Sequence, residues 1–375
     1  MSLYIWKLIS ENKVKIPNTP WTVICYSRAA RHTFLYIPEL YIAFDAGLAS
    51  EVHPTTIFIS HAHIDHVREL WSYVIEPVKG NPTVVVPRSS ADDIKTFVNS
   101  AIHMTKHNRK AQVAWNVVEA SIPKEVTSSV FLPNIMSINK LNFKIELFKC
   151  THSIPTTGYG MIEVRSKLKP EFVGLLQKEI ESLKLNGIQI CMNVDVPHFV
   201  VLGDTDHRVF YKDTKCTIFN SDLEKYSTIM VECTFLTDNK AKDAKDKKHM
   251  LWSRLFPFIH AHPNITFMLY HFSMCYRDAE IIQFFKALNI PNVIPLITDL
   301  EHIIGKNISD NDKCCSCGNR SLIDEIGQYE CDNVSDCGDH DEQDMVTDVS
   351  DTVVDVPNVV AVDGVEQLVI PVTNA

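Results

Sequence analysis

IFISHAHIDH, residues 57 to 66, places three histidines and one carboxylate within six residues directly after an apolar run. Residues 52–60 end in alternating β-branched and aromatic side chains, which predicts a buried strand with the polar residues on the loop that leaves its carboxyl end. Irregular backbone there lets neighbouring side chains converge, and histidine with carboxylate is a ligand set that zinc favours. We therefore expect a two-metal site shared among His61, His63, Asp65 and His66. The alternative is a histidine-rich surface loop.

Three later strand-like runs also end in a candidate ligand. His152 follows the run 143–150, Asp204 follows 199–203, where Gly203 permits a sharp exit, and His271 follows 265–270. Taken singly, each has an ordinary alternative: a hydrogen-bonded histidine or a turn aspartate. Together with the first four they give the order His, His, Asp, His, His, Asp, His, which fits two metals with one carboxylate able to bridge them.

The pattern His61-x-His63-x-Asp65-His66, with the later His, Asp and His, resembles the metallo-β-lactamase-fold hydrolases. Further motifs are similar to those of ribonuclease Z in its short form, the endoribonuclease that removes 3′ trailers from precursor tRNA. These motifs are FDAG (44–47), HSIPTTGYG (152–160), GDT (203–205), ECTF (232–235), and HFS (271–273) with Tyr276. The resemblance covers roughly residues 20–300. It implies an α/β fold, an αββα sandwich of two mixed sheets with helices outside and the metals at one edge.

Phosphodiester cleavage by such a site needs an activated nucleophile and an acid. Two divalent ions, most simply Zn²⁺ with Mn²⁺ or Fe²⁺ as alternatives, can hold a hydroxide and neutralise a phosphate oxygen. The departing 3′ oxygen needs a proton, and histidine has the unperturbed pKa nearest neutrality. The resemblance places this acid at His249, with Glu232 orienting it, and gives Asp65 a double role as ligand and partner of the hydroxide. A solvated histidine in a lysine-rich loop is the alternative for His249.

Two departures from the family pattern concern substrate contacts and the acid. Relatives often carry an arginine where this chain has Cys275, so a phosphate contact is lost or moved to Arg277. Ser273 and Tyr276 are the other expected contacts beside the last ligand. After His249 come Met250, Leu251 and Trp252, where hydroxyl or small residues are usual, and this could alter how the acid is held.

The charge of the chain is divided unevenly. Its net charge is −10, but residues 1–305 hold 30 acidic and 33 basic side chains, and residues 306–375 hold 16 acidic and 3 basic. We expect a nuclease domain over 1–305, near neutral to weakly basic and so compatible with an RNA partner, and an acidic tail over 306–375. The tail contains five of the 11 cysteines and a low-complexity end, which favours disorder over a small zinc knuckle.

Three basic segments are candidates for holding RNA. Lys106, Arg109 and Lys110 end a helix-like stretch that begins near Ala91, and the alternative there is a solvated helix end whose cations offset the dipole. Lysines at 240–248 form a second segment, with a flexible solvated loop as the alternative. Residues 165–184 lie where ribonuclease Z enzymes project an arm that holds the tRNA elbow. This segment is short and has helical periodicity, so a reduced arm and a packed helix are both open.

The remaining expectations concern location, partners and rival functions. The amino terminus lacks a signal-peptide pattern, no apolar run is long enough to span a membrane, and the front cysteines have no framework spacing, which favours an intracellular protein without a membrane partner. The resemblance also implies precursor tRNA as partner and allows a homodimer. One rival is another hydrolase of this fold acting on a small or cyclic phosphodiester, a thioester or a lactam. The other is a non-catalytic RNA-binding relic.

Overall fold

The computed structural model describes residues 2–75, 77, 80–111, 113, 115–126, 129–213 and 215–300, together with two strands near the carboxyl end. Met1–Asp299 forms one compact unit and Leu300–Ala375 a second. In the second unit, β16 (Val359–Val362) pairs antiparallel with β17 (Val365–Leu368). The rest of the acidic tail, with its cysteines and the possible zinc knuckle, lies outside the described residues.

The first sheet of the front unit has seven strands in chain order. Its first four strands are antiparallel, and from β4 onward the strands are parallel. They are β1 (Val14–Lys15), β2 (Thr22–Arg28), β3 (His32–Ile37), β4 (Ile42–Phe44), β5 (Thr56–Phe58), β6 (Thr83–Pro87) and β7 (Asn116–Ala120).

The second sheet has the order β15-β14-β13-β12-β11-β10-β8, and β9 pairs with β10. Pairing is antiparallel from β8 to β12 and parallel from β12 to β15. The strands are β8 (Ser129–Phe131), β9 (Met136–Ile138), β10 (Leu141–Cys150), β11 (Thr156–Leu168), β12 (Cys191–Val201), β13 (Thr228–Glu232), β14 (Thr266–Tyr270) and β15 (Val293–Pro295).

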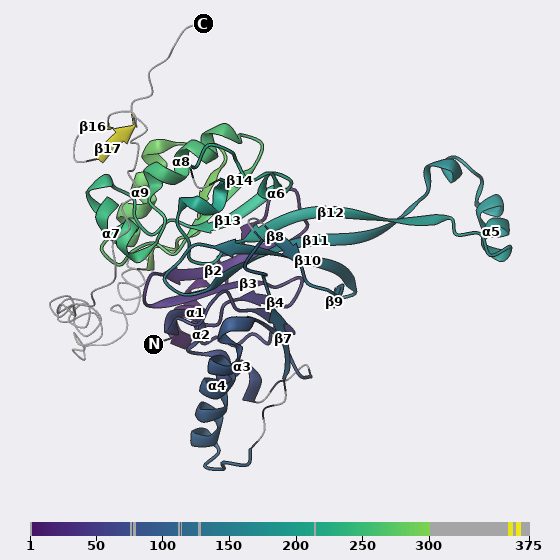
Figure 1. The fold of residues 1–375 in the computed structure, drawn as a ribbon, viewed down its shortest axis with the longest axis horizontal. Helices are drawn as coiled ribbons and strands as arrows, with labels where there is room; N and C mark the ends of the chain where they lie inside the picture. Colours follow the sequence, from purple (N-terminus) through teal and green to yellow (C-terminus); the bar gives the residue numbers. More distant parts are fainter. Residues whose placement is uncertain are drawn as a thin grey trace, which may run out of the picture. The chain divides into compact units, whose positions relative to one another are not determined.

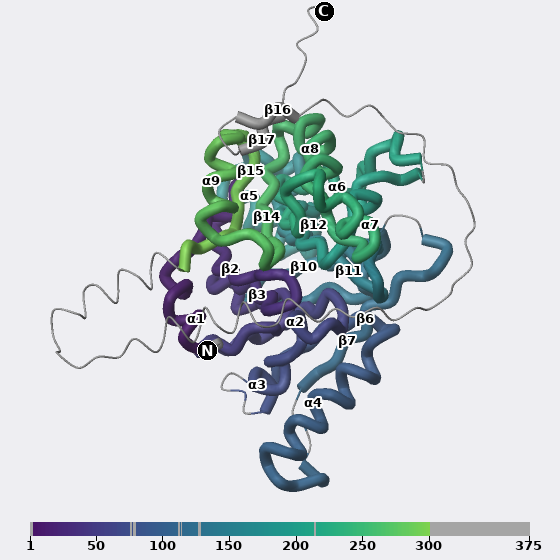
Figure 2. The backbone as a smooth tube through the Cα atoms, turned by 90° about the vertical axis from the view of Figure 1, so that its left-hand side faces the viewer, coloured from purple at the N-terminus to yellow at the C-terminus, as the bar shows by residue number. Residues whose placement is uncertain are grey.

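The two sheets pack face to face, and the helices lie outside them (Figure 1, Figure 2). This confirms the αββα sandwich expected from the sequence. Beside the first sheet lie α1 (Ser2–Ile9), α2 (Ile64–Val67), α3 (Leu70–Ile75) and α4 (Ala91–Thr105). Beside the second lie α6 (Ser221–Glu224), α7 (Ala241–Lys247), α8 (Trp252–Ala261) and α9 (Asp278–Leu288). Short 3₁₀ turns stand at Arg88–Ser90, Pro170–Phe172, His207–Phe210 and Asp238–Lys240.

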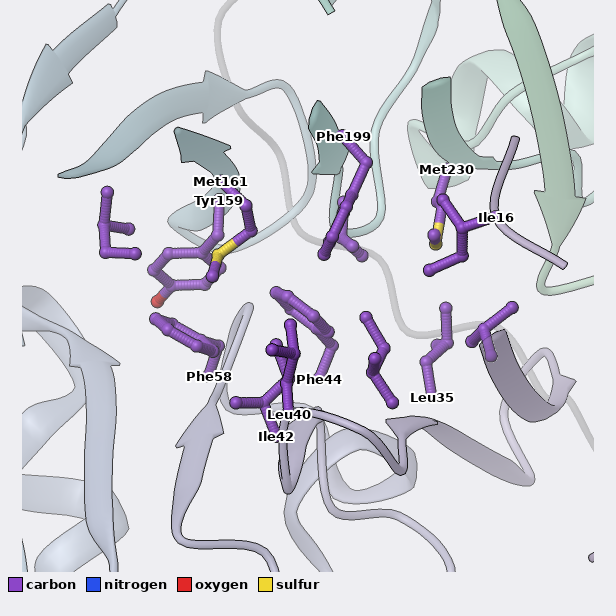
Figure 3. Packing of buried hydrophobic residues seen from close by; sticks show 14 of the residues in the cluster. Ile16, Leu35, Leu40, Ile42, Phe44, Phe58, Tyr159, Met161, Phe199 and Met230 are labelled. Atoms are coloured by element: carbon purple, nitrogen blue, oxygen red, sulfur yellow. The ribbon is translucent and has the colours of Figure 1, made fainter. Parts of the chain in front are cut away.

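Large apolar side chains from both sheets fill the space between them (Figure 3). Phe44 and Phe58 of the first sheet stack at 5.1 Å, and Phe58 meets Tyr159 of the second at 5.1 Å between ring centroids. The Tyr159 hydroxyl donates a hydrogen bond of 2.6 Å to the Ile59 carbonyl oxygen. A side chain of the second sheet therefore fixes the end of β5, at the start of the ligand loop.

Strands β11 and β12 continue beyond the sheet as a long hairpin that carries α5 (Gln177–Leu185) near its tip (Figure 1). No residue of α5 is buried. Residues 165–184 therefore belong to an arm, and the packed helix that the sequence left open is wrong. Apolar side chains at both ends of α5 are exposed, Leu176 directly before the helix and Leu185 at its last position, because no other element covers them.

The described part of the chain contains no helix long and apolar enough to cross a membrane.

Candidate metal and proton-transfer site

The ligand loop begins sooner than expected after its strand. β5 ends at Phe58, and α2 begins at Ile64. The Asp45 carboxylate accepts hydrogen bonds from the Ser60 amide, at 2.7 Å, and from the Ser60 hydroxyl, at 3.0 Å. These bonds draw Ser60 away from regular strand pairing, so the chain turns before His61.

The carboxyl ends of β10, β12 and β14 lie at the same edge of the second sheet and bring the later candidates together. β12 and β14 both run parallel to β13. β10 and β12 are both antiparallel to β11, so β10, β12 and β14 all run in the same direction. Gly203 precedes Asp204, and a Cβ atom there would lie 2.6 Å from the Thr156 side chain and 2.7 Å from that of Ser60. Gly203 thus allows the two sheets to approach closely. Its φ is not in the left-handed region, so this close packing, and not the backbone conformation, is what requires a glycine.

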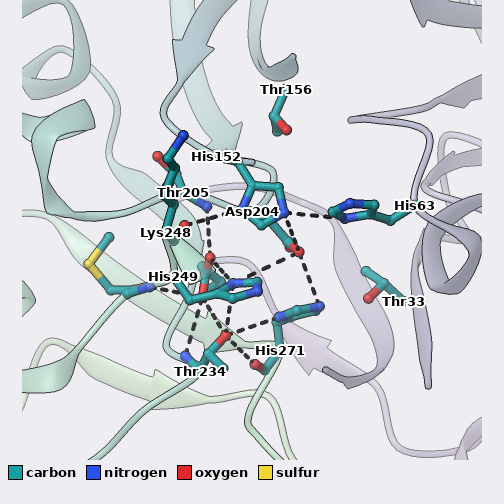
Figure 4. A network of polar contacts seen from close by, with 12 residues as sticks. Thr33, His63, His152, Thr156, Asp204, Thr205, Thr234, Lys248, His249 and His271 are labelled. Atoms are coloured by element: carbon teal, nitrogen blue, oxygen red, sulfur yellow. Dashed lines mark hydrogen bonds and ion pairs between the residues drawn. The ribbon is translucent and has the colours of Figure 1, made fainter. Parts of the chain in front are cut away.

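The first ligand cluster consists of His61 Nε2, His63 Nδ1 and His152 Nε2. His61 Nε2 lies 3.0 Å from His63 Nδ1, and His152 Nε2 lies 3.2 Å from the same atom. Asp204 Oδ2 is 3.7 Å from His61 Nε2 and 3.8 Å from His152 Nε2. Figure 4 shows His63, His152 and Asp204 directed at one point.

The second ligand cluster consists of Asp65 Oδ2, His66 Nε2 and His271 Nε2. Both imidazole nitrogens lie 3.5 Å from Asp65 Oδ2 and 3.4 Å from Asp204 Oδ2. Asp204 Oδ2 therefore lies within 3.4 to 3.8 Å of imidazole nitrogens of both clusters. All seven side chains singled out in the sequence meet at this site.

These atoms fit divalent metal ions. His66 Nε2, His271 Nε2 and Asp204 Oδ1 are buried and have no hydrogen-bond partner among the described residues. Bonds of 2.0–2.1 Å around a tetrahedral ion separate its ligands by about 3.3 Å, close to the separations within both clusters. Buried polar atoms rarely lack partners, so divalent metal binding accounts for them better than a protein contact does.

Four of the five imidazoles are oriented through Nδ1, which leaves Nε2 for the metal. His66 Nδ1 donates to Asp45 at 2.7 Å, and His152 Nδ1 donates to the Lys248 carbonyl at 3.1 Å. His61 contacts the Ser60 hydroxyl at 2.9 Å, and His271 contacts the Thr234 hydroxyl at 3.1 Å. Such outer partners fix the tautomer and ring plane of a ligand.

Burial and charge set the protonation of the ligands. Burial lowers the pKa of His61, His63 and His152, which keeps these imidazoles neutral and able to bind a cation. For Asp204, burial would raise the pKa, but the charges of His271 and His66 hold it well below its usual range.

His249 stands beside the ligands as the expected acid. Its Nδ1 donates to Glu232 Oε1 at 2.8 Å, its ring lies 4.7 Å from that of His152, and its side chain is 14 % exposed. Burial alone would lower the pKa of His249, but the charge and hydrogen bond of Glu232, followed by the charge of Asp204, raise it to about 9. The imidazole is therefore held protonated at neutral pH, with Nε2–H free of any partner in the described structure.

Glu232 is fully buried and its two oxygens accept several hydrogen bonds. Oε1 accepts from the Thr205 amide at 2.7 Å as well as from His249, and Oε2 accepts from the amides of Met250, at 3.1 Å, and Thr234, at 3.3 Å. The Thr234 hydroxyl also donates to Oε2. These donors offset the cost of burying a carboxylate and fix its direction. Glu232 is therefore shielded from solvent and directed at His249.

The segment after His249 packs inward, although its residues differ from the family pattern. Met250, Leu251 and Trp252 are buried, and a bridge joins Leu251 to Phe235. Large apolar residues thus tie the acid to the ECTF loop. Lys248 has φ +54° and offers its carbonyl to His152, so the acid segment is also joined to the first ligand cluster.

The expected substrate residues lie in two places. Ser273, Tyr276 and Arg277 form the loop after His271, where the Tyr276 hydroxyl accepts a hydrogen bond of 3.1 Å from the Leu236 amide. Arg277 is exposed and pairs with Glu280 at 3.1 Å. Lys106, Arg109 and Lys110 lie beyond α4, on the turn that leads toward β7.

Buried Arg28 was missed in the sequence. Its guanidinium donates to the Ser273 carbonyl at 2.9 Å, to the Tyr276 carbonyl and to the Asp278 carboxylate, and so holds the loop after His271 against the first sheet. Asp45 and Thr234 were also not assigned as ligand partners. A signal for Asp45 existed, since a carboxylate after the apolar run 42–44 needs buried donors, but nothing local marks Arg28.

The chain was compared with protein families, curated proteins and solved structures. No family model matches the chain. Over 272 residues it is 30% identical to tRNase Z TRZ1 of Arabidopsis thaliana, covering 71% of this chain and 90% of that protein. It is 29% identical over 265 residues to the chloroplastic tRNase Z TRZ2 of the same plant, covering 68% of each. Nuclear ribonuclease Z of Triticum aestivum is 29% identical over 177 residues, 45% of this chain and 90% of that one. The solved human tRNase Z, short form, superposes with a TM-score of 0.40 at 16% identity, covering 69% of this chain and 88% of that chain.

Proposed function

Because the chain belongs to the tRNase Z family, we propose that it is an endoribonuclease that removes the 3′ trailer of precursor tRNA. The observation that carries this proposal is the position of the His249–Glu232 pair beside two ligand clusters that both lie close to Asp204 Oδ2. A hydrolase of thioesters or lactams needs the clusters alone. A protonated histidine next to them suits the expulsion of a ribose oxygen.

Each cluster holds one divalent ion in this proposal. His61, His63 and His152 would hold the first, and Asp65, His66 and His271 would hold the second. Asp204 Oδ2 lies close to the nitrogens of both clusters and would be available to either ion. Zn²⁺ is the proposed ion because three of four ligands on one side are imidazoles, whereas Mn²⁺ and Fe²⁺ are the alternatives. When bound, the two ions supply an activated water and neutralise charge on the phosphate.

The protein side chains handle the protons. His249 Nε2 gives its proton to the departing 3′ oxygen, and Glu232 stabilises the charged imidazole until that step. Asp65, besides binding metal, accepts a hydrogen bond from the attacking water and orients it. Ser273 and Tyr276, beside His271, are proposed to contact the phosphates around the cleaved bond. Arg277 can join them, because its surface ion pair with Glu280 is weak and exchangeable.

The arm is proposed to hold the body of the tRNA away from the cleavage site. It projects from the sheet on β11 and β12, and Lys167, Lys169, Lys178 and Lys184 lie along it (Figure 1). An RNA substrate also implies an intracellular location, since precursor tRNA is made and trimmed inside cells. A homodimer remains part of the proposal by resemblance to the family.

The test compares substrates of the rival functions. Metal-loaded protein is offered a 3′-extended precursor tRNA, an activated small phosphodiester and a thioester, each with wild type and Asp65→Ala. Cleavage of the RNA that Asp65→Ala abolishes supports the proposal. Turnover of the thioester or small diester with intact RNA would assign another hydrolase. Unchanged RNA binding by both proteins with no turnover of any substrate would assign an RNA-binding relic.

A further inference from the structure

A hollow of about 640 Å³ lies at the carboxyl end of α4, apart from the metal site. Its lining combines an aromatic ring, two cations and two polar side chains, contributed by Trp115, Arg109, Lys110, Asn99 and His103. We call it the α4 hollow. Neither Arg109 nor Lys110 forms an ion pair in the part of the chain that the structure describes, whereas Lys95, earlier in the same helix, pairs with Asp92 and Glu119.

The turn that bounds the α4 hollow has a defined structure. The His103 ring donates to the Ala111 carbonyl at 3.2 Å, and the Asn108 amide donates to the His103 carbonyl at 3.2 Å. The Asn108 side chain in turn accepts from the Lys110 amide at 2.9 Å. These bonds fold the chain back at the helix end, so Arg109 and Lys110 lie with Trp115 in the lining of the α4 hollow.

Topology places the α4 hollow far from the metals. β5 and β6 are parallel, so α4, which follows β6, begins at the sheet edge where the ligand loop leaves β5. The helix has 15 residues and returns to the opposite edge, where parallel β7 starts directly after Trp115. Fifteen helical residues span about 22 Å. Figures 1 and 2 both show this end of α4 directed away from the second sheet.

The lining has the chemistry of a nucleotide site. An indole offers a face on which any base can stack, arginine and lysine neutralise phosphates, and an asparagine amide can bond to a base edge. An acidic peptide would use the cations but not the stacking face. We propose that the α4 hollow is a second RNA-binding site, which takes an unpaired nucleotide of the substrate, with its base on Trp115 and its phosphates on Arg109 and Lys110.

The distance determines what this site can do. The proposed RNA-binding role of the α4 hollow rests on the proposed function, because only a polynucleotide can reach both the α4 hollow and the metal site across about 20 Å. Binding energy gained so far from the reacting bond is the same in the ground state and in the transition state. It therefore lowers KM for the long substrate and leaves kcat unchanged.

The experiment measures binding and turnover of a labelled 3′-extended precursor tRNA by the full chain. Binding is measured in a His249→Ala background, so that the RNA stays intact. The variants are Trp115→Ala, Trp115→Phe, and Arg109→Ala with Lys110→Ala. The matched control is Lys13→Ala with Lys15→Ala, which removes two exposed charges elsewhere in the same unit. kcat and KM are then measured for the same variants with His249 intact.

Trp115→Ala is expected to weaken binding and raise KM about 5- to 100-fold with kcat unchanged, and Trp115→Phe to stay within about threefold of wild type. The double arginine–lysine variant should lower the slope of log binding constant against log salt by about 1 to 2, and the control pair should not. Wild-type binding by both Trp115→Ala and the double variant would overturn the proposal. If wild type binds this RNA but does not cleave it, the proposed function fails, and the binding series still decides the α4 hollow.

Discussion

At the scale of single residues, Glu232 joins the acid to the sheet. It closes β13, is fully buried and accepts from His249 as well as from three backbone amides. Because these donors hold the carboxylate in one position, the His249 ring is held as well. His249, the proposed acid, is thus positioned by a residue that is itself fully buried.

The raised pKa of His249 gives the first prediction. An acid works only while it is protonated, so activity should be present at neutral pH and fall as pH rises through the pKa of His249. That fall should come above the ordinary histidine value of about 6.5 and toward 9. A pH profile of kcat on precursor tRNA measures it. His249→Ala should reduce kcat about 10²- to 10⁴-fold and remove this limb. An unchanged limb in the variant would assign it to another group.

The shared oxygen of Asp204 gives the second prediction. Asp204→Asn weakens a ligand of both clusters, so metal content per chain should fall from about two ions toward none. Inductively coupled plasma mass spectrometry of dialysed protein measures it. His249→Ala is the control and should keep both ions. Full metal content in Asp204→Asn would contradict the bridging position.

The sequence predicts the meeting of the seven candidate ligands because each follows an apolar run, and strand ends meet at sheet edges. Partners such as Asp45 and Thr234 could be suspected only as polar residues near those ends. Arg28 was out of reach, because its partners lie about 250 residues away and the contact depends on how two sheets pack. Gly203 marks a sharp exit from the strand in the sequence, but the structure shows that close approach to Ser60 and Thr156 requires the glycine.

At the scale of elements, two expected segments have different bounds in the structure. The strand expected over residues 52–60 is limited to β5 (Thr56–Phe58), because the Asp45 carboxylate accepts hydrogen bonds from Ser60. The apolar period of residues 276–288 predicts an outer helix over that range, but α9 begins at Asp278, because the Tyr276 carbonyl accepts from the Arg28 guanidinium. The spacing of hydrophobic residues predicted whether each segment is a strand or a helix, whereas buried polar contacts determine at which residue the segment begins or ends.

Arg28 gives the third prediction. Removing its guanidinium leaves the buried Asp278 carboxylate with one partner fewer. The carbonyls of Ser273 and Tyr276 also lose this donor. Arg28→Ala should therefore lower the free energy of unfolding by about 3–5 kcal/mol. Urea denaturation measures the change. Arg277→Ala is the matched control, since Arg277 stands in the same loop with an exposed pair, and it should cost less than about 1 kcal/mol. Equal small losses would mean that Arg28 does not hold the loop.

The arm gives the fourth prediction. Ser166 and Asn193 are opposite each other in the β11–β12 pairing, so residues 167–192 can be replaced by a two-residue Asn-Gly turn. Because no residue of α5 is buried, stability and turnover of a small phosphodiester should stay as in wild type. KM for precursor tRNA should rise at least about tenfold, since a remote binding surface is lost. Steady-state kinetics on both substrates measure this, and an unchanged KM would remove the arm from substrate binding.

At the scale of the whole molecule, function depends on joining two sheets. The first sheet supplies His61 to His66, the second supplies His152, Asp204 and His271, and the site exists only where their edges meet. The αββα class was predictable because the motif order resembles a known family. The projection of the arm from the sheet could not be predicted, because the apolar period of α5 fits a helix packed on the sheet equally well.

The charge distribution also belongs to this scale. Residues 1–305 carry a small excess of basic side chains, and residues 306–375 carry 16 acidic against 3 basic. The division into a nuclease domain and an acidic tail at 305 stays a proposal. It agrees with the observation that Met1–Asp299 forms a compact unit of its own.

The measurement that tests the central claim most directly is cleavage of an end-labelled precursor tRNA with a 3′ trailer, with the product ends mapped. Metal-loaded wild type should cut once near the discriminator nucleotide, chelator should abolish the cut, and His249→Ala should slow it about 10²- to 10⁴-fold. Intact RNA with fully metal-loaded wild type, or cleavage that survives chelation, would contradict the account.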